Sequence, residues 1–182
     1  MARQQRIQRE LKEVYCFIVE GCTEENYLKL LKKLYKKSGD IRNCGGGNAK
    51  GVMIDAKGFI AAKETVYSKF IVWFDGDRYD PKNSEELTLY NNLKAKADIY
   101  ISEPCIEAWL LAHFEQIQHC KNKECSKCEE KLNTYIPNYE KNNCILLEKY
   151  INKNNICDAI INYPAIKDYQ KIGFFLQNYF NI

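Results

Sequence analysis

An apolar run that ends in a carboxylate and a glycine constrains the fold of this chain more than any other feature. Residues 14–19, Val-Tyr-Cys-Phe-Ile-Val, are almost all β-branched or aromatic, and Glu20-Gly21 follows directly. A strand without polar alternation is buried on both faces, which is typical of a parallel sheet covered by helices. The first charged residue after it then marks the carboxyl end of the strand, where sheets of this kind bind ligands.

A second apolar strand ends in the same way. Residues 70–74, Phe-Ile-Val-Trp-Phe, run into Asp75-Gly76-Asp77. The glycine lets the backbone turn tightly, and Mg²⁺ or Mn²⁺ prefers the oxygen ligands that two nearby aspartates offer. Parallel strands bring their carboxyl ends to one edge, so these acids and Glu20 are predicted to form a metal site. The alternative is a solvated turn, in which Asp-Gly-Asp is common.

The order of the predicted elements indicates one α/β domain. Strands are predicted at 14–19, 70–74 and 98–102, and helices at 23–37, 52–68, 84–96 and 105–114. Helices between successive strands favour a mostly parallel, Rossmann-like sheet with helices on both faces. Thr23 is the predicted N-cap of the first helix, and Pro104 is predicted in the first turn of the fourth. Residues 1–115 are the predicted core, 116–140 a cysteine-containing insert, and 141–182 a helical C-terminal part packed on the same domain.

Composition narrows the classes of protein that fit. The net charge of +3 over 182 residues is too small to indicate nucleic-acid binding by itself. The first thirteen residues are rich in Arg, Lys, Gln and Glu, and the apolar run after them is short, so neither a signal peptide nor a membrane span is expected. Nine cysteines in a chain without an export signal suggest a cytoplasmic protein with thiols or metal ligands rather than disulfides.

The insert clusters residues that bind zinc in other proteins. The predicted ligands are Cys120, Cys125, Cys128 and His119. A Cys-x-x-Cys pair with a further thiol and an imidazole nearby suits tetrahedral Zn²⁺, so a structural zinc ion is one hypothesis. The fourth ligand stays open among His113, His119 and Cys144, because the adjacent His119 and Cys120 do not easily bind one ion. Ordinary buried or surface thiols are the alternative.

Three blocks of the sequence resemble the RloB-like family. They are residues 18–24, 74–78 and 102–114, and the third is the most specific. The resemblance covers about residues 10–160 and implies a TOPRIM-type fold. Related TOPRIM nucleases occur beside ABC-type ATPases in bacterial antiphage and restriction-associated loci. This chain has no Gly-x-x-x-x-Gly-Lys-Ser/Thr motif, so such an ATPase would be encoded separately.

The resemblance assigns roles to the carboxylates. Glu20 matches the invariant TOPRIM glutamate, which binds metal and takes part in proton transfer. Asp75 and Asp77 match the paired metal ligands. Glu24 matches a glutamate that related nucleases use around a second ion, although a carboxylate in the first turn of a helix also suits the helix dipole.

Two further residues are candidates for the same site. Glu107 lies in an otherwise apolar helical segment and is expected either near the metal or in an internal pair, because a lone buried charge is costly. Lys141 belongs to Tyr139-Glu140-Lys141, which resembles a Tyr-x-Lys element of the family. It is expected to stabilise charge on a phosphate, and an exposed loop lysine is the alternative.

The predicted activity is Mg²⁺-dependent hydrolysis of DNA or RNA in antiphage defence, with Glu20 moving a proton. Nucleic acid is predicted to contact Lys32, Lys36 and Arg78, although lysines opposite an apolar stripe are normally a solvated face. One alternative is a non-catalytic nucleic-acid-binding or regulatory subunit. Another is a phosphatase with Asp75 as nucleophile, but such enzymes have Ser or Thr shortly after the second aspartate. A homodimer is left open.

Overall fold

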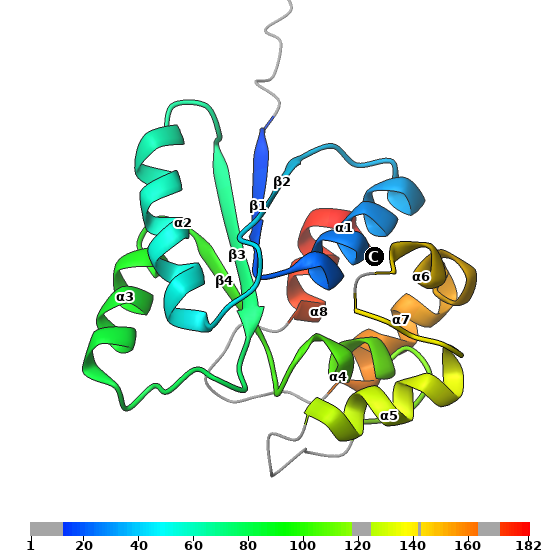
Figure 1. Cartoon of the computed structure of the whole chain (residues 1–182). Helices are drawn as coiled ribbons and strands as arrows, with labels where there is room; N and C mark the ends of the chain where they lie inside the picture. Colours follow the sequence, from blue (N-terminus) through cyan, green and yellow to red (C-terminus); the bar gives the residue numbers. More distant parts are fainter. Residues whose placement is uncertain (1–12, 118–124, 142, 164–171) are drawn as a thin grey trace, which may run out of the picture.

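The carboxyl ends of four parallel strands define the layout of the molecule (Figure 1). The computed structural model describes residues 13–117, 125–141, 143–163 and 172–182. The strands are β1 (Tyr15–Val19), β2 (Asp40–Asn43), β3 (Lys69–Asp75) and β4 (Asp98–Ser102), in the order β2-β1-β3-β4. The prediction of an α/β fold with a parallel, Rossmann-like sheet flanked by helices is confirmed.

Helices connect the strands and continue after the last one. The helices are α1 (Cys22–Tyr35), α2 (Ala49–Lys63), α3 (Ser84–Lys94), α4 (Ile106–Leu111), α5 (Cys125–Tyr135), α6 (Cys144–Tyr150), α7 (Lys153–Asn162) and α8 (Ile172–Phe175), with a π-helical turn η1 at Leu176–Phe180. None of the helices in the described ranges is long and apolar enough to cross a membrane.

The sheet is buried on both faces because alternate residues of β1 and β3 point to opposite sides. Ile18, Val72 and Phe74 pack on one side with α2 and α3. Phe17 and Trp73 pack on the other side with α1, α4 and the C-terminal helices. Figure 1 shows these two layers on either side of the strands. The apolar runs without polar alternation are therefore explained by burial on both faces.

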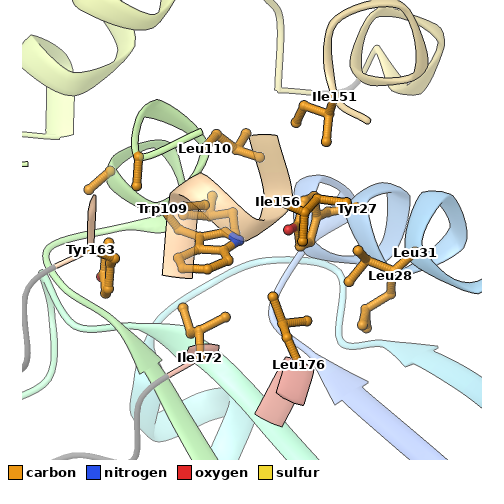
Figure 2. Packing of buried hydrophobic residues seen from close by; sticks show 14 of the residues in the cluster. Tyr27, Leu28, Leu31, Trp109, Leu110, Ile151, Ile156, Tyr163, Ile172 and Leu176 are labelled. Atoms are coloured by element: carbon orange, nitrogen blue, oxygen red, sulfur yellow. The ribbon is translucent and has the colours of Figure 1, made fainter. Parts of the chain in front are cut away.

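The C-terminal helices complete the second layer of the core. Figure 2 shows Ile156 of α7 and Leu176 of η1 near Tyr27 and Trp109, which belong to α1 and α4. All four residues are 0% exposed to solvent. Truncating a buried tryptophan of this kind to alanine costs about 3–5 kcal/mol, so this packing holds α4 firmly against the sheet.

Two predictions at the start of the chain are wrong. No strand is predicted between the first two helices, because residues 41–51 carry a glycine-rich loop signal, but Asp40–Asn43 form the strand β2. As an edge strand it pairs with β1 only, so it needs no apolar run. Thr23 is not the N-cap of α1, which is Gly21. The Thr23 hydroxyl instead donates a hydrogen bond to the Lys141 carbonyl at 2.8 Å.

Two helix starts also differ from the predictions. The helix expected from residue 52 begins at Ala49, because the side chain of Asn48 accepts a hydrogen bond from Gly51 N at 2.8 Å and caps the helix. Pro104 precedes α4 instead of lying in its first turn, and Cys105 is the N-cap.

Candidate active site

A cavity of about 250 Å³ opens at the carboxyl edge of the sheet. It is bounded by the end of β1 and start of α1, the loop after β2, the end of β3, the start of α4, and Lys141. Residues 139–141 are called the 139–141 segment below. The lining residues are Glu20, Gly21, Cys22, Thr23, Glu24, Gly45, Gly46, Asp75, Ile106, Glu107 and Lys141. Four of the predicted carboxylates and the predicted lysine therefore line one space.

Strand register explains why the first two acids meet. Val19 is in register with Trp73, and the Glu20 N–H donates to the Trp73 carbonyl at 3.1 Å. Glu20 therefore leaves β1 beside the last residue of β3, Asp75. The Asp75 N–H donates to Glu20 Oε2 at 2.9 Å, which orients the glutamate.

Backbone donors orient two more of the acids. Asp75 Oδ1 accepts a hydrogen bond from the Ile106 N–H, in the first turn of α4, at 2.8 Å. Glu24 Oε2 accepts one from the Gly21 N–H at 3.0 Å, which caps the start of α1. Both carboxylates thus have one oxygen held by main-chain atoms.

Burial, and after it the charges of neighbouring acids, raises the pKa of three acids at the cavity. Burial raises the pKa of Glu24 to about 7, and the charges of Glu20 and Glu107 contribute further. Burial also raises the pKa of Asp75 well above its ordinary value, with Glu24 and Glu20 as the next causes. The pKa of Glu20 is raised by burial and by the charge of Asp77. Neighbouring carboxylates repel one another when they are ionised in a buried site. Acids with strongly raised pKa values are typical of functional sites.

Glu107 is the most deeply buried of these acids, with a side chain 0% exposed. Its Oε1 accepts a hydrogen bond from the Tyr139 hydroxyl at 3.1 Å and lies 3.3 Å from Lys141 Nζ. Its Oε2 is buried and has no hydrogen-bond partner among the residues that the structure describes. The structure thus combines the two expectations for Glu107, an internal pair and a place at the cavity. A buried carboxylate oxygen without a partner is costly, and a cation in the cavity is the kind of partner that it lacks.

Asp77 lies beside the cavity rather than in its lining. It is half-buried and accepts a hydrogen bond from Cys125 Sγ at 3.7 Å. A side chain in place of Gly76 would be crowded by β4, since its Cβ would lie 3.0 Å from Ile101 Cγ2 and 3.2 Å from the Ser102 carbonyl oxygen. The two aspartates therefore differ in environment although they are two residues apart.

The donor chemistry of the cavity fits Mg²⁺ or Mn²⁺ better than a softer metal. Within the part of the chain that the structure describes, no group of three or more His, Cys, Asp or Glu side chains is arranged as a formed metal site. The four lining carboxylates nevertheless supply only oxygen, and each is held through one oxygen. The unpaired Oε2 of Glu107 is the atom that a hard cation would satisfy.

The three basic residues predicted to contact nucleic acid are not brought together. Arg78 is exposed and close enough to Glu20 to lower its pKa, against the larger effect of burial. Lys32 lies in the last turn of α1 and Lys36 is its C-cap, whereas the first turn of this 14-residue helix lines the cavity. Lys32 Nζ also donates to the Gly39 carbonyl. The two lysines are therefore about 15–20 Å along the helix from the site.

The predicted zinc ligands lie partly outside the described residues, as His119 and Cys120 do. Cys125 and Cys128 lie in the first turn of α5, and their thiols raise the pKa of Cys105, which the sequence reasoning did not include among the ligands. His113 is a core residue, since its Nε2 lies 2.9 Å from the Tyr27 hydroxyl and burial lowers its pKa to about 4. The zinc hypothesis stays a prediction.

Sequence reasoning missed one wall of the cavity. Gly45 and Gly46 line it, and both have φ values in the left-handed region, 83° and 84°. The Gly46 N–H donates to the Glu20 carbonyl at 2.7 Å, which holds the loop beside β1. The three consecutive glycines were visible as a loop signal, but without β2 the loop had no place at the carboxyl edge of the sheet.

Fold and site together define an α/β protein with a parallel sheet and an acidic cavity at its carboxyl edge. A model of one protein family, described as RloB-like protein, matches residues 15–171. The chain belongs to the RloB-like family. A search of curated proteins found no match, and a search of solved structures found none.

Proposed function

We propose that this chain is a Mg²⁺- or Mn²⁺-dependent TOPRIM-type nuclease that hydrolyses phosphodiester bonds of DNA or RNA. The observation that carries the proposal is the set of four carboxylates lining one cavity, with a glutamate after β1 and an aspartate at the end of β3. Membership of the RloB-like family supports it. Acids crowded in this way destabilise a fold, so their presence together favours a role in binding or catalysis.

Glu20, Glu24, Asp75 and Glu107 are the residues that would hold the cation. When bound, a divalent cation polarises a phosphate and makes water more acidic. The raised pKa of Glu20 suits it to accept a proton from the attacking water and return it to the leaving oxygen.

Lys141 has a separate role in the proposal. Its side chain is 50% exposed, so its ammonium group can reach a phosphate at the mouth of the cavity. There it would neutralise charge that develops on the phosphate oxygens during cleavage. Its present partner, Glu107, keeps a second hydrogen bond from Tyr139 when the lysine moves away.

The proposed biological setting rests on the family resemblance alone. We propose action in the bacterial cytoplasm, in antiphage defence, together with a separately encoded ABC-type ATPase. The cleavage assay below therefore includes reactions with and without such an ATPase and ATP.

The test is cleavage of labelled DNA and RNA by the full chain with Mg²⁺, Mn²⁺ or EDTA. Cleavage is expected only with a divalent cation, and Glu20→Gln should lower its rate by about 10²–10⁴. The matched control is Glu64→Gln, because Glu64 is exposed and pairs with Lys96 far from the cavity lining. Equal activity of both variants would show that the cleavage does not come from this cavity.

A non-catalytic binding or regulatory subunit is the second candidate. The contact between Glu107 and Lys141 favours it, because the lysine neutralises one of the acids. Under this reading the wild-type chain binds nucleic acid or the ATPase without cutting any substrate, and Glu20→Gln binds equally well.

A further inference from the structure

The 139–141 segment reaches the cavity from beyond α5 and is fastened there by hydrogen bonds to two helices. The Thr23 hydroxyl, in the first turn of α1, donates to the Lys141 carbonyl at 2.8 Å. The Tyr139 hydroxyl donates to Glu107 Oε1, on α4, at 3.1 Å. The segment therefore joins the helix that carries Glu24 to the helix that carries Glu107.

Tyr139 and Lys141 approach the same oxygen of Glu107 in different ways. Tyr139 is buried, at 5% exposure, and its N–H is held by Asn133 Oδ1 at 3.0 Å. Lys141 is half exposed and also lies 4.0 Å from Glu129. The buried Tyr139 is thus fixed against Glu107, whereas the half-exposed Lys141 can leave Glu107 and bind a substrate phosphate.

The tyrosine contact determines which oxygen of Glu107 remains for a ligand. Oε1 is bonded to Tyr139, and within the described part of the chain the buried Oε2 of this cavity-lining residue has no partner. A hydrogen bond to one oxygen of a carboxylate restricts its rotation and so orients the other oxygen, as partners behind metal ligands commonly do.

We propose that Tyr139 is a positioning residue that orients Glu107 as a ligand for the divalent cation, and that Thr23 holds the 139–141 segment in place for this role. The inference rests on the proposed function, because it assigns a task within the same cavity. Tyr139 acts through Glu107 and does not itself touch the cation or the substrate.

A purely structural role for Tyr139 makes a different prediction. Its ring belongs to the same hydrophobic cluster as Trp109 and Leu132, and Tyr139→Phe keeps that packing while removing only the hydroxyl. If Tyr139 merely fills space, the phenylalanine variant should bind cations like the wild type.

The chain offers a matched control in Tyr135. Its hydroxyl donates to Glu115 Oε2 at 2.9 Å, so it makes the same type of contact four residues earlier, with an acid that does not line the cavity. Tyr135→Phe therefore removes a Tyr-to-Glu hydrogen bond without touching the proposed site.

The experiment measures Mn²⁺ binding to the full chain by calorimetric titration, and the Mg²⁺ dependence of cleavage, for wild type, Tyr139→Phe, Thr23→Val and Tyr135→Phe. Tyr139→Phe is expected to weaken Mn²⁺ binding about 10–100-fold and to raise the Mg²⁺ concentration for half-maximal activity by a similar factor. The rate at saturating Mg²⁺ should change little. Thr23→Val should show a smaller effect in the same direction, and Tyr135→Phe none.

The outcomes separate the inference from the proposed function. Wild-type affinity for Mn²⁺ in folded Tyr139→Phe and Thr23→Val overturns the inference while leaving the nuclease proposal intact. A wild-type chain that neither binds Mn²⁺ nor cleaves nucleic acid overturns both. If Tyr139→Phe does not fold, judged by circular dichroism and thermal unfolding, the result for Thr23→Val decides.

Discussion

Asp55 and Asp75 show two opposite environments for the same side chain. Asp55, on α2, receives hydrogen bonds from Arg42 Nε at 3.0 Å and Arg42 Nη2 at 2.8 Å. The Arg42 guanidinium lowers the pKa of Asp55. Asp75 faces no such cation among its hydrogen-bond partners, and burial together with neighbouring glutamates raises its pKa. Asp55 is stabilised as an anion, whereas ionising Asp75 costs free energy because it is buried among other acids.

The difference between these two aspartates shows that the unfavourable charges of this fold lie at the cavity. In exposed ion pairs such as Lys96 with Glu64 and Lys33 with Glu148, each charge has an opposite partner. Such pairs contribute little to the free energy of unfolding. The cavity holds several buried acids close together, and replacing them with neutral residues would be expected to make the fold more stable. We therefore expect substitution of a cavity acid to lower activity or raise stability. Substitution in the Arg42–Asp55 pair should instead leave activity unchanged and lower stability.

The largest expected effect is on activity. Asp75→Asn should lower Mg²⁺-dependent cleavage by about 10²–10³, because it removes one charged group from the centre of the acidic cavity. Asp55→Asn should cleave at the wild-type rate. Initial rates of cleavage at saturating Mg²⁺ measure both, and a loss of similar size in the two variants would remove the contrast between the regions.

The next effect is on the pH dependence of stability. Because the pKa of Glu24 is raised to about 7 in the folded chain, folding favours its protonated form. The free energy of unfolding should therefore fall as the pH rises from the ordinary glutamate pKa to above 7, by up to about 3 kcal/mol from this residue. Urea unfolding at pH 5 and pH 8 measures the fall.

The control for this pH effect is Glu24→Gln, which cannot ionise. It should show a smaller fall and be more stable than the wild type at pH 8. A variant less stable than the wild type at pH 8 would mean that the ionised Glu24 stabilises the fold, contrary to the repulsion argued above. Saturating Mg²⁺ should reduce the same fall in the wild type by binding the ionised acids.

The smallest effect is expected at the exposed pair. Arg42→Ala should lower the free energy of unfolding by about 0.5–1 kcal/mol at pH 7, because both side chains of the pair are more than a third exposed to solvent. The sign with pH is opposite to that of Glu24. The pKa of Asp55 is lowered in the folded chain, so the stabilisation is present above its ordinary pKa and is lost as the pH falls through the folded value. Urea unfolding of wild type and variant should show a larger difference at pH 7 than at pH 3.

The sheet and the meeting of Glu20 with Asp75 were predictable because both depend on local patterns. Two apolar strands that end in acids must bring them to one edge if the strands are parallel and adjacent. The distant contacts were not predictable in this way. The hydrogen bond of Cys125 to Asp77 joins residues 48 positions apart, and that of Thr23 to Lys141 joins residues 118 apart.

The resemblance to the family and the local sequence patterns predicted different residues of the site. Lys141 and Glu24 were candidates mainly because of the family resemblance, and the structure places both at the cavity. Lys32 and Lys36 were selected from charge on a helix face, which says nothing about distance from a site. The edge strand β2 was missed because its polar residues carry no burial pattern, and the glycine wall of the cavity was missed with it.

The orientation of the acids depends on main-chain atoms at three positions. The N–H groups of Gly21, Asp75 and Ile106 hold Glu24, Glu20 and Asp75 respectively. A donor of this kind does not change when its own side chain changes, so residue 106 is free to vary among apolar types without altering the direction of Asp75. Only proline, which has no N–H, removes such a donor. At residues 21 and 106, which are not acids, most substitutions therefore leave the donor in place, whereas a substitution at residue 75 also replaces an acid of the cavity.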